Sequence, residues 1–258
     1  MAIATRTDSL LAPTFTHQTL YDAVKAAFLN AGFTAVFDEF ISGTDKVVVY
    51  AIVLDNTKTF GTTYLRVKVT SAFIIGQQLF GTWNTATDTG TGASTEITYT
   101  ALINTVQVNF VNLNGVNEYK LVVIQQAANV IVLGFISPAN KPIWWDLNAW
   151  NYCFIFTTNV YFVVRGTTFN PYTNTEYDSI LNNARMANAN VQTNRRDLLP
   201  GIVFFTQTNQ GISGRSSDDL VMISASGTTR YDTIQIPGDT KQYLLLNPAS
   251  GGLAVRTV

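Results

Sequence analysis

The sequence predicts a mainly β fold with minor α content, an α+β arrangement of two β-rich, sandwich-like domains with an N-terminal helix packed on the first. Short apolar runs rich in Val, Ile and aromatic residues recur along most of the chain, and Gly, Asn, Pro and Thr separate them. One segment near the start has helical spacing instead. A length of 258 residues can accommodate one large domain or two moderate ones.

The helix is expected between Thr16 and Gly32. Apolar residues recur there at the spacing of a single helical face: Leu20, Val24, Ala27, Phe28 and Ala31. Thr16 is a suitable N-cap residue, and Gly32 favours the left-handed backbone that often ends helices. The pattern predicts an amphipathic helix that packs on its own sheet.

The first domain is expected to continue as antiparallel β structure up to residue 137. Its predicted strands are residues 47–54, 64–70, 72–83, 96–101, 106–111, 119–125 and 130–136. The run 47–54 is continuously apolar, which is typical of a buried central strand. Asn114-Gly115 predicts a tight hairpin. Segments 1–11 and 85–94 lack such patterns, and we expect them to be flexible and able to clasp neighbouring chains.

The domain junction is expected at Pro138 and Pro142, because prolines remove backbone donors and favour extended chain. Residues 138–258 then form an aromatic-rich β domain with one helix at about 174–190. Further strands are predicted at residues 154–156, 161–165, 202–206, 220–225, 231–236, 243–247 and 253–256.

Charged residues make up only 13% of the chain, against about 25% in ordinary soluble domains. Small neutral polar surfaces are covered at low cost, because no ion must be desolvated. This composition predicts a surface that other subunits largely cover. The net charge of −1 argues against nucleic acid as a partner. We expect no membrane insertion, since no apolar run approaches roughly 20 residues. The first residues lack the layout of a signal peptide, so we expect the chain to be synthesised and assembled in a cytoplasm.

The candidates for catalysis or metal binding are few. Asp88-Thr89-Gly90 matches the triplet of aspartic proteases, but its Thr- and Gly-rich surroundings indicate a hairpin tip. Cys153 lies in an aromatic run and is expected to be buried. With His17 as the one histidine, the usual zinc ligand sets are excluded. We therefore expect no enzyme, no metal and no cofactor.

The strongest candidates for an interface or ligand site are aromatic. Residues 144–152 form the densest aromatic cluster, with Trp144, Trp145, Asp146, Trp150 and Tyr152 as its candidate contact residues. Large aromatics dominate interface energetics, and aromatics beside a carboxylate also suit a sugar. Arg195 and Arg196 form a small cationic patch, which favours a solvated face or a pairing site between subunits over nucleic-acid binding.

Several stretches resemble virion proteins of tailed bacteriophages in overall character. They are residues 195–202 (RRDLLPGI), 210–220 (QGISGRSSDDL), 242–248 (QYLLLNP) and 252–256 (GLAVR), together with 17–21 (HQTLY) and 45–50 (DKVVVY). The resemblance implies a structural protein of the tail, baseplate, fibre or neck, present in symmetric copies, and it carries over no catalytic residue.

The function expected from the sequence is that of a structural subunit of a phage particle, localised in the virion. Its partners would be copies of itself and other virion subunits. Three alternatives remain open: a receptor- or glycan-binding module at a tail fibre that contacts a host surface glycan, a capsid decoration protein, and a depolymerase. The depolymerase would need two facing carboxylates.

Overall fold

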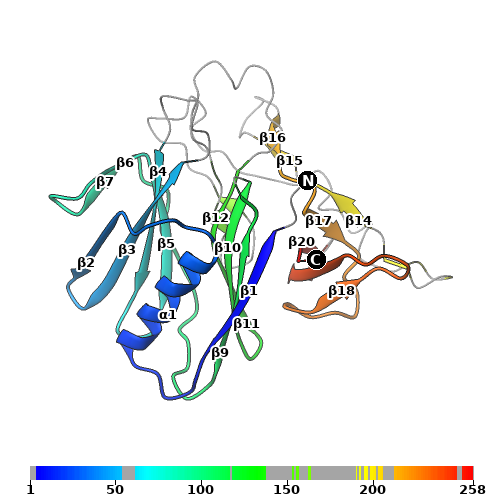
Figure 1. Ribbon diagram of the computed structural model, residues 1–258, viewed down its shortest axis with the longest axis horizontal. Coiled ribbons are helices and arrows are strands. Elements are labelled where there is room, and N and C mark those ends of the chain that lie inside the picture. Colours follow the sequence, from blue (N-terminus) through cyan, green and yellow to red (C-terminus); the bar gives the residue numbers. More distant parts are fainter. Residues whose placement is uncertain are drawn as a thin grey trace.

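A computed structural model shows a mainly β molecule with one α-helix in its described part, as the sequence predicts. The structure describes residues 4–53, 62–116, 118–137, 153, 155–156, 162–163, 190, 192, 195–196, 198–201, 203–205, 212–248 and 252–257. Three larger sheets lie next to one another, and the N-terminal helix packs at one side between the first two (Figure 1). None of the described helical structure is long and apolar enough to span a bilayer.

The first sheet contains five antiparallel strands in the order β2-β3-β4-β5-β8. They are β2 (Asp38–Ser42), β3 (Asp45–Val53), β4 (Thr62–Val69), β5 (Ile75–Phe80) and β8 (Ile97–Thr98). The predicted run 47–54 is the buried strand β3, and it lies between β2 and β4. In β4 the apolar residues Leu65, Val67 and Val69 are buried and face the core, while Arg66 and Lys68 lie on the outer face.

The second sheet has the order β1-β9-β10-β11. Its strands are β1 (Thr5–Leu11), β9 (Val108–Asn114), β10 (Tyr119–Gln126) and β11 (Asn129–Ile136). The predicted Asn-Gly hairpin joins β9 to β10, but its loop is longer than two residues, because Asn114 still pairs with Lys120.

Two segments that were expected to be flexible contain strands. Residues 5–11 form β1, which pairs along its whole length with β9. Part of segment 85–94 forms β7 (Thr89–Thr91), which pairs with β6 (Thr82–Asn84) as a separate hairpin. Both expectations were wrong for one reason: these polar strands have no hydrophobic alternation of their own, and their partners supply the backbone hydrogen bonds.

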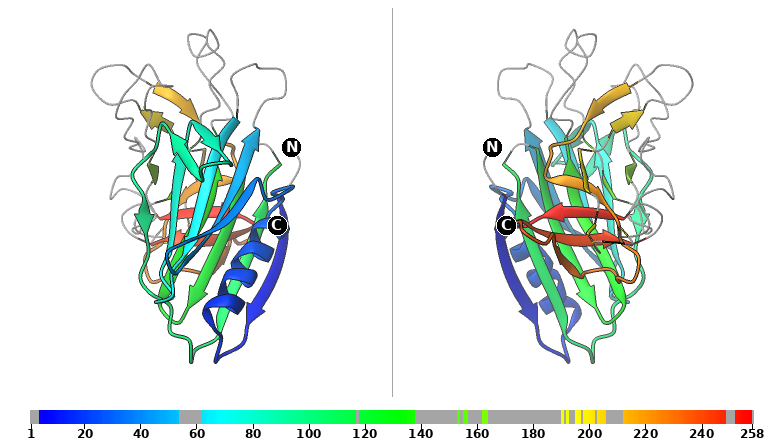
Figure 2. Two further views of the ribbon diagram at one scale, coloured as in Figure 1. Left: turned by 90° about the vertical axis from the view of Figure 1, so that its left-hand side faces the viewer. Right: turned by 90° about the vertical axis from the view of Figure 1, so that its right-hand side faces the viewer.

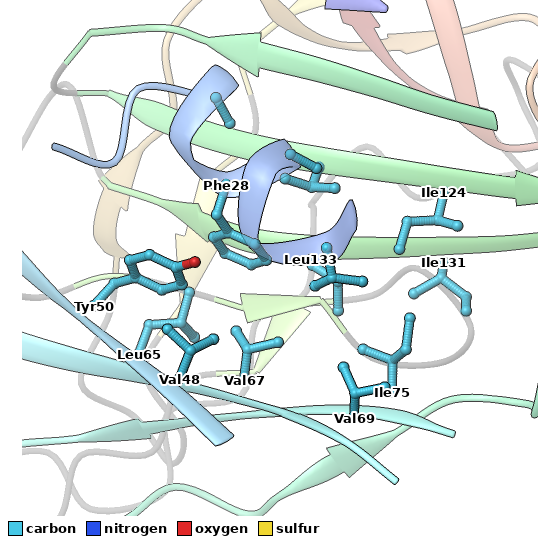
Figure 3. Packing of buried hydrophobic residues seen from close by; sticks show 14 of the residues in the cluster. Phe28, Val48, Tyr50, Leu65, Val67, Val69, Ile75, Ile124, Ile131 and Leu133 are labelled. Carbon is cyan, nitrogen blue, oxygen red and sulfur yellow. The ribbon is translucent and has the colours of Figure 1, made fainter. Parts of the chain in front are cut away.

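The helix α1 (His17–Asn30) closes the space between these two sheets. Thr16 caps it as predicted: its hydroxyl accepts a hydrogen bond from the Thr19 amide, and the Thr16 amide donates to the Thr19 hydroxyl. All the apolar residues of the predicted helical face are buried. Phe28 stacks on Tyr50 of β3, with ring centroids 4.8 Å apart (Figure 3). The helix and both sheets therefore share one core.

A third sheet, formed by the C-terminal part of the chain, covers the outer face of the second. Its order is β14-β17-β20-β19-β18. The strands are β14 (Leu198–Pro200), β17 (Leu220–Ile223), β20 (Leu253–Arg256), β19 (Gln242–Asn247) and β18 (Thr233–Gln235). Its strands cross those of the second sheet in projection (Figure 2). An apolar cluster that includes Leu121, Val123, Leu220 and Leu246 joins the two sheets.

Two short ribbons complete the described chain. They are β12 (Ile155–Phe156) with β13 (Phe162–Val163), and β15 (Val203–Phe205) with β16 (Ile212–Arg215). Cys153 and Ile155 are buried in the core that contains α1, although they follow the predicted junction. The division at residues 137 and 138 stays a prediction. The helix predicted at about 174–190 falls almost entirely on residues outside the described part.

Candidate functional site

The aromatic residues singled out in the sequence cannot be placed by the structure. Trp144, Trp145, Asp146, Trp150 and Tyr152 all lie outside the described residues. Their role as an interface or a glycan site therefore stays a prediction. The candidate surfaces that the structure does place are on other parts of the chain.

The predicted cationic pair Arg195 and Arg196 is divided between two environments. Arg195 is exposed, whereas Arg196 is half-buried. The Arg196 guanidinium donates hydrogen bonds to the carbonyl oxygens of Ser224 and Ser226, at 2.6 and 3.0 Å. Arg196 therefore ties the chain ahead of β14 to the turn that follows β17.

The open edges of the first two sheets are the best candidate interaction surfaces of the described chain. β1 and β2 are outer strands of their sheets, and both lie on the side of the sandwich that α1 closes (Figure 2). A strand at an edge presents unpaired backbone N–H and C=O groups, which can pair with another chain. The sequence does not show either strand to be an edge, because an edge depends on which strands are neighbours in the sheet and not on the local pattern of residues.

β1 combines charged and apolar side chains on one face. The Arg6 guanidinium holds the Asp8 carboxylate in a two-pronged ion pair, with N–O distances of 2.8 and 2.9 Å. Leu10 follows on the same face and is 65% exposed. Arg6 and Asp8 lie opposite Leu113 and Val111, so this is the face toward the C-terminal sheet.

β2 presents different groups on its two faces. The Asp38 carboxylate accepts a 2.6 Å hydrogen bond from the Trp83 indole on the outer face. The adjacent Glu39 points the other way and accepts hydrogen bonds from Tyr21 and Lys25 of α1. The two neighbouring acids thus point to opposite faces, as successive residues of a strand do, and form no catalytic pair. Ile41 is 67% exposed near the end of this strand.

The hairpin β6–β7 covers part of the outer face of the first sheet. The Trp83 ring stacks on Phe40, and its edge-to-face contact with Phe80 has a centroid distance of 4.9 Å. The indole N–H is bonded to Asp38. The Trp83 side chain therefore has its partners within the chain, and these contacts fasten the hairpin to the sheet.

Charges on this outer face are paired. Glu96 forms ion pairs with both Arg66 and Lys68, with N–O distances of 2.9 and 2.6 Å. The Arg66 guanidinium also lies over the Phe80 ring, 5.3 Å from its centroid. One carboxylate thus pairs with two cations, and because the Asp38 carboxylate lies on the same face, this face carries no strong field.

The reactive side chains of the described part are held in structural roles. His17 Nε2 lies 2.8 Å from the Val69 carbonyl oxygen, which links the start of α1 to the end of β4. Burial raises the pKa of the Cys153 thiol, so this residue stays protonated and unreactive at neutral pH. Across the described ranges, no three His, Cys, Asp or Glu side chains gather in a way that could hold a metal ion.

Arg215 forms an ion pair in the turn that leads into β17. Its guanidinium pairs with the Asp218 carboxylate and donates to the Pro200 carbonyl oxygen at 2.9 Å. Asp219 instead lies 3.7 Å from Arg256. These contacts connect β14, β16, β17 and β20 at one end of the C-terminal sheet.

Comparison with known proteins adds no further assignment. No protein-family model matches the chain, and no curated protein sequence matches it either.

Proposed function

We propose that this chain is a structural subunit of a bacteriophage particle, placed in the tail, baseplate or fibre apparatus, and that it acts through symmetric protein–protein assembly. The low charge and the resemblance of residues 195–202 and 210–220 to virion proteins support this proposal. Symmetry would multiply contacts that are individually weak. Catalysis is not part of the proposed role.

One structural observation carries the proposal. Among the exposed large apolar residues of the described chain, Ile41 and Leu10 are the two most exposed, at 67% and 65%. They lie on β2 and β1, the open edges of the first two sheets. Soluble proteins normally protect edges with charges, prolines or bulges. β1 and β2 carry such charges, and each also exposes a large apolar side chain beside them. We infer that another subunit covers these apolar side chains.

Analysis of purified particles tests this proposal directly. Quantitative mass spectrometry of washed particles, from the phage whose genome encodes the chain, should find it at a fixed copy number per particle, as closed symmetry requires. Antibody labelling should then place it on the tail or baseplate. Absence from washed particles, with the chain abundant in the unfractionated lysate, would contradict the proposal. Labelling of the capsid surface would favour a decoration protein.

A receptor- or glycan-binding module at a fibre is the second candidate, and the aromatic residues 144–152 favour it. A glycan array separates it from a purely structural role. If the chain binds a host glycan, the wild type should give a discrete signal on the array, and Trp144→Ala and Trp150→Ala should each abolish it. Trp83→Ala is a suitable control, because Trp83 is already engaged with Asp38 and Phe40.

A further inference from the structure

β1 is the most complete open edge in the described chain. All seven of its residues pair with β9 on one side. No backbone hydrogen bond joins Thr5–Leu11 to any other described segment. Both views in Figure 2 place β1 (dark blue) at the margin of the molecule, beside α1. A strand of this length can accept another strand and so continue the sheet.

Closed symmetry restricts how two copies of β1 can pair. In an antiparallel dimer, the two-fold axis runs perpendicular to the sheet, so the same residue of both copies meets at the axis. For pairing near the middle of β1, that residue is Arg6, Thr7, Asp8 or Ser9. An axis at Ser9 places the Asp8 carboxylate opposite Leu10 and forms no ion pair across the axis. An axis at Arg6 places two guanidinium groups opposite each other, and an axis at Asp8 places two carboxylates opposite each other. Like charges directly opposite destabilise a sheet.

An axis at Thr7 gives complementary charges instead. Arg6 of each copy then lies opposite Asp8 of the other, so two ion pairs form across the axis. Opposed residues of an antiparallel pair share a face, which places all four charges together beside the C-terminal sheet. Arg6 uses two N–H groups on its own Asp8, and a guanidinium has five. The remaining donors are available to the second carboxylate.

The same register also matches the apolar residues. Leu10 of one copy lies opposite Ala4 of the other. Ala4 belongs to the apolar cluster between the second and third sheets. Leu10, which is 65% exposed in the single chain, would therefore extend that cluster across the axis. Thr7 of both copies meets at the centre of the other face, where hydroxyl pairs favour strand association.

We propose that two copies of this chain pair antiparallel through β1, with Thr7 of both copies at the two-fold axis. The sheet β1-β9-β10-β11 then continues from one copy into the next as eight strands. This inference rests on the proposed role in assembly, because it names the copy-to-copy contact that such a role uses. The partner is a second copy of the same chain.

Disulfide trapping of the full-length chain tests the register. Opposed Cα atoms lie about 4.5–5.5 Å apart, within the range of a disulfide. Thr7→Cys should therefore give a covalent dimer under mild oxidation. Ser9→Cys is the matched control, since its two copies would be about 14 Å apart. Cys153, at 2% exposure, does not compete. Trapping through Asp8→Cys or Ser9→Cys in place of Thr7→Cys would overturn this register.

Charge exchange tests the ion pairs. Sedimentation equilibrium should give a dimer dissociation constant that Arg6→Asp or Asp8→Arg each raise by about ten-fold, because opposite charges become like charges. The double variant Arg6→Asp with Asp8→Arg should restore dimerisation. Lys241→Asp is the control, since Lys241 and Asp239 form a comparable exposed pair two residues apart. Circular dichroism melts should show every variant folded, because exposed ion pairs contribute little stability.

The outcomes separate this inference from the proposed function. A chain that stays monomeric at high concentration, or a double variant that fails to recover, would overturn the β1 contact. Particle analysis is independent of it: the chain can be found in particles and assemble through another surface, such as β2. A dimer trapped at Thr7 in a chain that particles lack would leave the contact standing and overturn the virion role.

Discussion

The two faces of the sheet β1-β9-β10-β11 are both buried, but they are built differently. The inner face meets α1 and the first sheet in a core that combines aliphatic residues with aromatic rings in defined geometries. Phe28 stacks on Tyr50, and Phe33 contacts Phe135 edge to face, with centroids 5.7 Å apart. The outer face meets the C-terminal sheet mainly through branched aliphatic residues: Val111, Leu113, Leu121, Val123, Leu220, Leu244, Leu246 and Val255.

The two faces therefore contribute to the fold in different ways: the angles of ring contacts matter on the inner face, and the buried apolar area matters on the outer face. Ring contacts have preferred angles, so they fix how α1 and the two sheets meet. Aliphatic burial is non-directional, and it stabilises the C-terminal sheet in proportion to the area removed from water. We expect the inner face to determine global stability, and the outer face to determine whether the third sheet stays attached.

Phe28→Ala should have the largest effect. Phe28 is fully buried and contacts both Phe33 and Tyr50, so its loss should lower the free energy of unfolding by about 3–5 kcal/mol. Urea unfolding followed by circular dichroism measures this value. Leu29→Ala is the matched control: the side chain is adjacent, 45% exposed, and should cost under about 1 kcal/mol. Equal losses at the two positions would refute the importance of the aromatic contacts.

Leu246→Ala tests the outer face. Leu246 is fully buried in the cluster between the second and third sheets, and its truncation should cost about 2–4 kcal/mol. The loss should be local. Hydrogen exchange should accelerate in β17, β19 and β20, while amides of α1, β3 and β4 stay protected. Uniform acceleration throughout the chain would show that the two faces form one cooperative unit.

The sequence predicts the inner face better than it predicts the edges. The spacing of Leu20, Val24, Ala27 and Phe28 shows the buried side of α1 directly, and alternation in 65–69 shows the buried side of β4. β1, β2 and β14 carry no such pattern, because only their neighbours make them strands. The candidate surface on β1 was missed for the same reason. The ion pair between Arg6 and Asp8, two residues apart, was its one visible signal.

Two buried amide side chains of the inner core should give opposite changes in the free energy of unfolding when each is replaced by leucine. Gln77 connects the two sheets: its amide donates to Tyr99 and to the Val132 carbonyl, and it accepts from the Gly134 N–H at 3.0 Å. Asn112 is also fully buried, but neither polar atom of its side chain has a hydrogen-bond partner among the described residues.

Gln77→Leu should therefore lower the free energy of unfolding by about 2 kcal/mol, because the buried Gly134 N–H loses its acceptor. Asn112→Leu should raise it by about 1 kcal/mol, since an apolar side chain of similar size removes an unpaired buried amide. Chemical denaturation of both variants gives the two values. Destabilisation by both substitutions would mean that Asn112 is paired in the folded protein, and its side-chain amide should then be protected from exchange.

The contact between α1 and the β2 edge should give the smallest effect, and it should depend on pH. Burial opposes ionisation of Glu39, yet hydrogen bonds from Lys25 and Tyr21 hold the pKa of Glu39 below its usual value. A carboxylate with a lowered folded pKa stabilises the protein above its unfolded pKa of about 4.3, and that contribution is lost as pH falls through the folded pKa. Because 43% of the Glu39 side chain is exposed, the contribution should stay under about 1 kcal/mol.

Glu39→Gln should thus be slightly less stable than wild type at pH 7 and equal to it near pH 3, as measured by urea unfolding at both values. Lys25→Met removes the main partner and should reproduce that convergence, whereas a constant difference between Glu39→Gln and wild type at both pH values would assign the effect to packing.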